Sequence, residues 1–90
     1  MMKKFHTSTE AGFYDYLLSR GYRESTALDY VRRIRKIDEI ETLIRKDLDP
    51  YIADYTEGAH RSTNISAHNA YSSALKRLKE YQNHRGIVVA

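Results

Sequence analysis

The 90-residue chain has no cysteine and no tryptophan, only one proline and four glycines, and no long apolar run. Without cysteine it forms neither a disulfide nor a zinc site built on thiolates. No stretch approaches the roughly 18 apolar residues of a membrane-spanning helix, so we expect no membrane partner. The length predicts a single domain over residues 1–90, because domains rarely divide below about 100 residues. Since cysteine-free chains suit a reducing compartment, we expect a cytoplasmic protein.

Charge is present in blocks along the chain. Residues 1–36 carry eight Lys/Arg against four Asp/Glu, residues 37–57 carry two against seven, and residues 58–90 carry five against one. The formal net charge of +3 therefore conceals a basic, an acidic and a second basic block, with net charges of +4, −5 and +4. Because basic segments favour anionic partners such as nucleic acid, the position of each block on the fold matters more than the total.

Hydrophobic spacing predicts four helices and no strand. Apolar residues recur at intervals of three and four, and capping residues and glycines mark the ends. Thr7 and Glu10 have capping-box spacing at the first start. The predicted helices span about residues 8–20, 26–38, 47–56 and 63–84, followed by a short apolar tail at 87–90. Residues 38–44 either extend the second helix or connect it to the third, and the expected fold is an all-α, compact four-helix bundle.

Tyrosine supplies eight of the ten aromatic residues. Its apolar ring and polar hydroxyl suit the edge of a core or an interface. Helical spacing places three tyrosines on core faces, as residues at the edge of the core: Tyr30, Tyr71 and Tyr81. Three others are expected to be exposed and available for contacts: Tyr22, Tyr51 and Tyr55.

No motif of the chain indicates an enzyme. The common phosphate-binding, dinucleotide-binding, serine-nucleophile and zinc-protease motifs are missing. His60 and His68 stand eight residues apart, which is not a usual zinc spacing, and the acidic clusters lack the glycine of a calcium loop. No tyrosine is accompanied by the cations that a phosphate-transferring tyrosine needs. We therefore expect no catalysis, no cofactor, no metal and no small-molecule substrate.

Two predicted helices have a cationic outer face. On the second helix this face holds Ser25, Asp29, Arg32 and Lys36, with Arg33 and Arg35 on its flanks. Asp29 precedes two of these arginines by three and four residues, so internal pairing is the alternative to phosphate contacts. The outer face of the last helix mixes small polar and cationic residues: Asn69, Ser72, Ser73, Lys76 and Lys79. Such faces can follow a phosphate backbone, and the two would merge if the helices were neighbours.

Three stretches of the sequence carry a family resemblance. Residues 13–30 follow the pattern F-x-x-Y-L and then G with T-x-x-x-Y, and residues 43–52 and 62–78 continue the order of the remaining helices. Together they resemble the SAM-like core-binding domain of tyrosine recombinases, the integrases of phages and other mobile elements. The resemblance implies a four-helix module that clamps DNA, with its second and fourth helices at the major groove and the flanking phosphates. The recombinase catalytic domain has no counterpart in the 90 residues, so recombination is not implied.

The resemblance also implies which residues contact DNA. Backbone contacts fall on Thr26, Arg32, Arg33 and Lys36. Groove contacts fall on Ser62, Thr63, Asn69, Ser73, Lys76 and Arg77, and the charge pattern of the last helix adds Lys79.

Two functions stay open at this point. The first is a non-catalytic module that binds double-stranded DNA through the two basic faces. The alternative is a protein–protein or regulatory module that self-associates or inhibits a partner protein. In that alternative the blocks of opposite charge, the tyrosines and the tail at 87–90 would supply the contacts.

Overall fold

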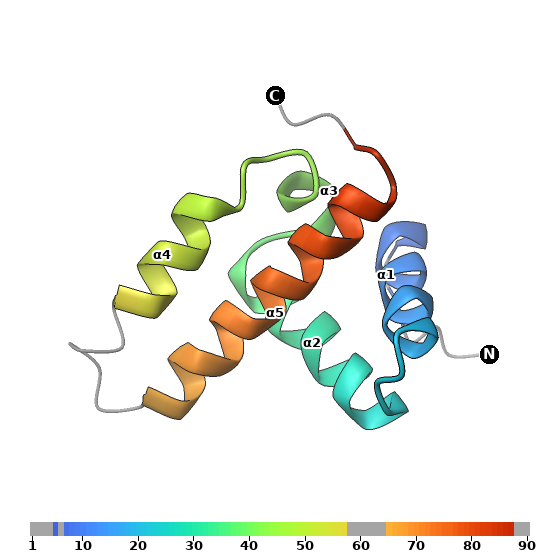
Figure 1. Cartoon of the computed structure of the whole chain (residues 1–90), viewed down its shortest axis with the longest axis horizontal. Helices are drawn as coiled ribbons and strands as arrows, with labels where there is room; N and C mark the ends of the chain where they lie inside the picture. The colour runs from blue at the N-terminus through green and yellow to red at the C-terminus, as the bar shows by residue number, and fades with distance from the viewer. Residues whose placement is uncertain (1–4, 6, 58–64, 88–90) are drawn as a thin grey trace.

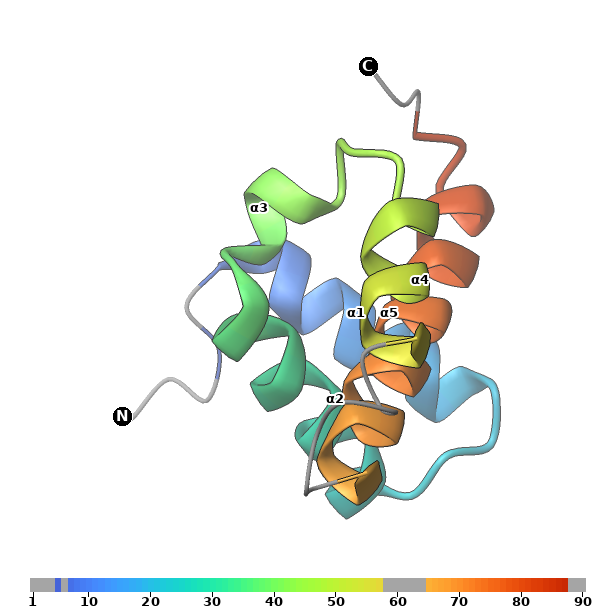
Figure 2. The same cartoon turned by 90° about the vertical axis from the view of Figure 1, so that its left-hand side faces the viewer.

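A computed structural model describes residues 5, 7–57 and 65–87 of the chain (Figure 1). This part is all-α, as predicted, and contains no strand. Its helices are α1 (Ser8–Ser19), α2 (Glu24–Ile37), α3 (Ile40–Leu43), α4 (Asp49–Glu57) and α5 (Ile65–His84). The long helix α5 contacts α1, α2 and α4. Figure 2 shows α4 side by side with α5, and α3 close to the start of α1.

The described helices number five where four were expected, because residues 38–44 do not continue α2. Asp38 is extended, with φ −169° and ψ 174°, and Glu39 is extended as well. The chain then makes the single turn of α3, which places Ile40 and Leu43 in the core. Burial of these two side chains explains the break, since a straight continuation of α2 would carry them away from the core.

Helix ends follow local side-chain chemistry. The Thr7 hydroxyl accepts a hydrogen bond from the Glu10 amide at 3.2 Å, which confirms the predicted first cap. Gly21 and Gly86 follow the ends of α1 and α5 and have φ of +94° and +65°, the left-handed conformation that favours glycine at a helix end. The Asp47 carboxylate accepts from the Asp49 amide at 3.1 Å, so α4 begins two residues later than predicted.

The core joins the apolar stripes of α1, α2 and α5. It consists of Phe13, Leu17, Ala27, Val31, Ile34, Ile40, Leu43, Ile44, Leu48, Ala74, Leu75, Leu78 and Tyr81.

A charged pair beside the core connects α1 to α2. The Arg35 guanidinium donates to both carboxylate oxygens of Glu10, at 2.8 and 3.2 Å, and Glu10 is only 3% exposed. Glu10 therefore does more than the predicted capping role, because its buried carboxylate fixes the position of α2 on α1.

A buried amide connects α5 to the segment between α3 and α4. Gln82 is 3% exposed, and its Nε2 donates to the carbonyl oxygens of Ile44 and Lys46 at 2.7 and 2.8 Å. These carbonyls follow the short helix α3, where no helical partner is available. Gln82 thus satisfies backbone groups that the break after α2 leaves open.

Replacement of Gln82 by methionine is expected to lower the free energy of unfolding by about 2 kcal/mol. Methionine fills a similar volume but leaves the Ile44 carbonyl buried without a donor, which costs about 1–3 kcal/mol. Urea unfolding followed by circular dichroism measures the loss. The exposed neighbour Asn83 is the matched control, since its replacement by methionine should change the free energy by less than about 0.5 kcal/mol. Equal effects of the two variants would contradict this role of Gln82.

Candidate nucleic-acid interface

The outer face of α2 is the one predicted from the spacing of its residues. Ser25, Asp29, Arg32 and Lys36 are exposed, whereas Arg33 and Arg35 are half-buried on the two flanks. The buried stripe of the helix lies on the other side and consists of Ala27, Val31 and Ile34. The apolar stripe therefore determines which cations face solvent.

The four cations of this helix have different surroundings. Arg35 is bound by Glu10, whose hydrogen bond raises the pKa of the guanidinium. The Arg33 guanidinium lies 5.6 Å from the ring centre of Tyr71 on α5, a cation–π distance. Arg32 and Lys36 make no hydrogen bond or ion pair with any other residue in the described part of the chain.

Asp29 also forms no ion pair with its neighbours, so the internal pairing considered for this face is not observed. A shallow hollow of about 400 Å³ lies on the same face. It is lined by Asp29, Arg32, Arg33, Arg35 and Lys36. Two uncompensated cations one turn apart, with a third held against an aromatic ring beside them, form a surface suited to oxyanions such as phosphate.

The cations of α5 are more fully compensated. Arg77 donates to the Tyr22 hydroxyl at 2.7 Å, which raises the pKa of the guanidinium, and it pairs with Glu80 at 2.9 Å. Lys79 pairs with Asp49 of α4, and this hydrogen bond raises the pKa of the lysine. Of the three cations predicted to bind DNA on α5, Lys76 alone is exposed and has no hydrogen bond or ion pair with a described residue.

The polar residues predicted on the outer face of α5 fall into different environments. Ser72 is 6% exposed, so its assignment to the outer face was wrong. Helix α5 packs against α4 as well as against α1 and α2, so more of its surface is covered than its apolar stripe indicates (Figure 2). Ser73 and, on α2, Thr26 are half-buried.

Three predicted contact residues lie wholly or partly outside the described residues. Ser62 and Thr63 lie outside the described residues, as does the Asn69 side chain, although the Asn69 backbone belongs to α5. Lys76, Arg77 and Lys79 line a second hollow of about 430 Å³ against α4. This hollow shares no residue with the hollow on α2, so the two basic faces do not meet in one cavity.

The tyrosines expected to be exposed are half-buried instead. Tyr22 packs edge-on against Tyr30 with ring centres 5.7 Å apart, and Tyr55 lies 5.3 Å from Tyr71. The Tyr51 hydroxyl accepts a hydrogen bond from Lys46 at 3.3 Å. These rings fill the edges between helices. Tyr71 positions Arg33 and Tyr22 positions Arg77, and the sequence pattern revealed neither contact. Tyr81, in contrast, is buried as predicted.

Other kinds of site find little support in the described residues. Within them no group of three or more His, Asp or Glu residues is arranged to hold a metal ion. None of the described helices combines the length and the apolar character needed to cross a bilayer.

Comparison with known proteins gives no match: no family model, no curated protein and no solved structure matches the chain. The resemblance to core-binding domains thus rests on the three sequence stretches described above.

Proposed function

We propose that this chain is a non-catalytic module that binds double-stranded DNA, of the SAM-like type found in recombinase core-binding domains, and that it acts in the cytoplasm. The outer face of α2 is the primary contact surface. Arg32 and Lys36 bind phosphates of the DNA backbone, and Arg33 assists them from the flank. Lys76 and Ser73 on α5 form a secondary contact.

The observation that carries this proposal is the pair of exposed, uncompensated cations on α2. Arg32 and Lys36 are separated by four residues, about 6 Å along the helix, so both reach the same backbone strand. Their charges are not neutralised by Asp29, and the Arg33 guanidinium is oriented by the Tyr71 ring. Pre-oriented cations lose less conformational freedom when they bind phosphate, which favours this face over an ordinary charged surface.

A module of this size is expected to bind through phosphates with little sequence preference. Most of its affinity then comes from released counterions and falls steeply as salt is raised. The Arg77 and Lys79 side chains contribute less than the sequence pattern suggested, because Tyr22, Glu80 and Asp49 already engage them.

The binding of a fluorescein-labelled 30-base-pair duplex of mixed sequence, followed by fluorescence anisotropy at low salt, tests the proposed function. We expect saturable binding that unlabelled duplexes of unrelated sequence compete away. Absence of binding at a protein concentration of about 100 µM would reject the proposal, since even non-specific binding of proteins to DNA is usually tighter than that.

The second candidate is a protein–protein module, favoured by the acidic side chains between α2 and α5. Asp38, Glu39, Asp47 and Asp54 are exposed. They complement the α2 cations of another copy, and Lys79 and Asp49 already form such a pair within the chain. Light scattering at low and high salt separates the two functions. A monomer at both salt concentrations opposes self-association, whereas a salt-sensitive dimer without DNA binding supports it.

A further inference from the structure

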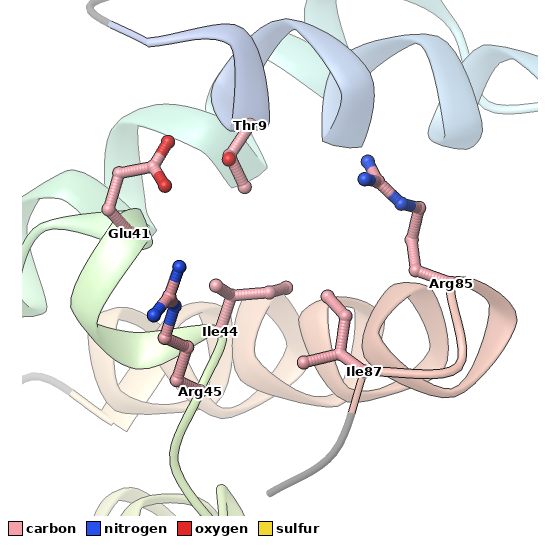
Figure 3. Close-up of a pocket in the computed structure, with 6 residues that line it drawn as sticks. All are labelled: Thr9, Glu41, Ile44, Arg45, Arg85 and Ile87. Carbon is pink, nitrogen blue, oxygen red and sulfur yellow. The ribbon is translucent and has the colours of Figure 1, made fainter.

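An open cavity of about 340 Å³ lies between the start of α1, the end of α3 and the end of α5 (Figure 3). It is lined by Thr9, Glu41, Ile44, Arg45, Arg85 and Ile87. None of these residues belongs to the hollow on α2, so the cavity is a separate feature of the surface. Its volume is at the lower end of the range of about 300–1,000 Å³ found for small-ligand sites.

Two arginines from different elements line this cavity, and neither forms an ion pair with a described residue. Arg45 follows α3 and is exposed, and its side chain forms no hydrogen bond or ion pair with another described residue. Arg85 follows α5, and its Nη1 donates to the Tyr81 hydroxyl at 2.7 Å. That phenol is neutral, so it orients the Arg85 guanidinium without compensating its charge. In Figure 3 the two side chains project from different sides of the hollow.

The one carboxylate that lines the cavity, Glu41, already has hydrogen-bond partners within the protein. Hydrogen bonds from Thr9 and Thr7, with a smaller contribution from the charge of Arg45, hold the pKa of Glu41 below its usual value. Both threonines lie at the start of α1, where the helix dipole also favours a negative charge. Glu41 therefore stays ionised and bound to α1. The charged side chains of the cavity leave a net charge of +1.

The remaining wall of the cavity is apolar. Ile44 is 4% exposed overall, and Gln82 holds its carbonyl group in place. Ile87 is half-buried and packs against the core. In Figure 3 the two isoleucine side chains lie together on the side of the hollow away from Thr9 and Glu41. A ligand that complements this cavity carries one negative charge and a short apolar body.

We propose that the cavity binds a small organic monoanion, a carboxylate with a short apolar tail. The guanidinium groups of Arg45 and Arg85 donate hydrogen bonds to the carboxylate, and the tail lies on Ile44 and Ile87. Guanidinium forks match the geometry of carboxylates, which explains two arginines where one lysine would supply the same charge. The inference goes beyond DNA binding, and it departs from the expectation that the chain has no small-molecule ligand.

Titration of the ¹⁵N-labelled protein with sodium 3-methylbutanoate, followed by its amide resonances, tests this site. We expect saturable shifts at Thr9, Ile44, Arg45 and Ile87, with a dissociation constant on the order of 1–10 mM for so small a ligand. The amides of Arg32 and Lys36 should stay in place. Inorganic phosphate in a parallel titration should bind at least about five-fold more weakly, because it lacks an apolar body. Shifts that do not saturate, or equal binding of phosphate, would overturn the proposal.

Variants of the cavity arginines make the test specific. Arg45→Gln removes a side chain without hydrogen bonds in the described structure, so the fold should persist, and binding should weaken about ten-fold. Arg85→Gln should weaken it to a similar extent. Arg20→Gln, at an exposed position at the end of α1, is the control with the same loss of charge and should leave binding unchanged. Unchanged binding by Arg45→Gln, in a protein with native circular dichroism, would show that the cavity is not the site.

Discussion

Replacement of Arg35 by methionine is expected to lower the free energy of unfolding by about 3 kcal/mol. The Glu10 side chain is only 4% exposed, whereas that of Arg35 is 31% exposed. Loss of the guanidinium removes two charge-assisted hydrogen bonds and the opposite charge from a buried carboxylate, and such a loss is costly. For a 90-residue domain this is a large part of the total stability of about 5–15 kcal/mol.

The exposure of the two partners also predicts an asymmetry. Glu10→Gln should destabilise the protein less than Arg35→Met, because the guanidinium that remains is partly solvated. The double variant Glu10→Leu/Arg35→Met should recover most of the loss, since no charge is then left buried. The loss in Arg35→Met should also shrink as the pH is lowered from 7 to about 4, because burial without the guanidinium favours the neutral form of the carboxyl group. Urea unfolding at two pH values measures both effects. Equal losses for the two single variants would contradict the account of this pair.

Reversal of both free charges on α2, in the double variant Arg32→Glu/Lys36→Glu, is expected to weaken duplex binding about 100-fold at low salt. Two charge-assisted contacts to phosphate are worth about 3 kcal/mol together, and reversal adds repulsion. The fold should persist, because both side chains are exposed and make no hydrogen bond or ion pair with a described residue. Fluorescence anisotropy with the same duplex measures the change.

A matched control separates this local effect from a general effect of net charge. Arg20→Glu/Lys46→Glu makes the same change in net charge at exposed positions outside the proposed interface. We expect less than a ten-fold loss for this control, arising from the weaker overall field. Similar losses in the two double variants would mean that binding depends on total charge and that α2 is not the contact surface.

The class of fold was predictable from the sequence because helix signals are local. The apolar spacing predicted the buried face of α2, and on α5 it predicted the buried apolar residues but missed Ser72 and Gln82. Thr7, Gly21 and Gly86 marked helix ends where the structure has them. The short helix α3 was not predicted as a separate element. Its existence depends on burial of Ile40 and Leu43 against segments far away in sequence, which local spacing does not contain.

The outer face of α2 was also predictable, since helical periodicity places Arg32 and Lys36 opposite the buried stripe. The partners of the other cations were not. Arg35 meets Glu10 across 25 residues, Arg77 meets Tyr22 across 55, and Lys79 meets Asp49 across 30. No spacing rule within one helix reveals such pairs, so the sequence overestimated how many cations of α5 are free.

The cavity at the end of α5 had no signal in the sequence at all. Its arginines are 40 residues apart and belong to no motif, and both line one cavity in a fold where Gln82 of α5 binds the segment after α3. An isolated arginine is usually a solvated surface residue. A joint role of Arg45 and Arg85 becomes visible only from the cavity that both side chains line.

The salt dependence of duplex binding tests the central claim most directly. The logarithm of the binding constant should fall linearly with the logarithm of salt concentration, with a slope that counts the phosphates neutralised. If Arg32 and Lys36 bind phosphates, the neutral variant Arg32→Gln/Lys36→Gln should lower the magnitude of this slope by about 2 relative to the unmodified protein. An unchanged slope, or no measurable binding by the unmodified protein at low salt, would contradict the assignment of α2 as a DNA-binding surface.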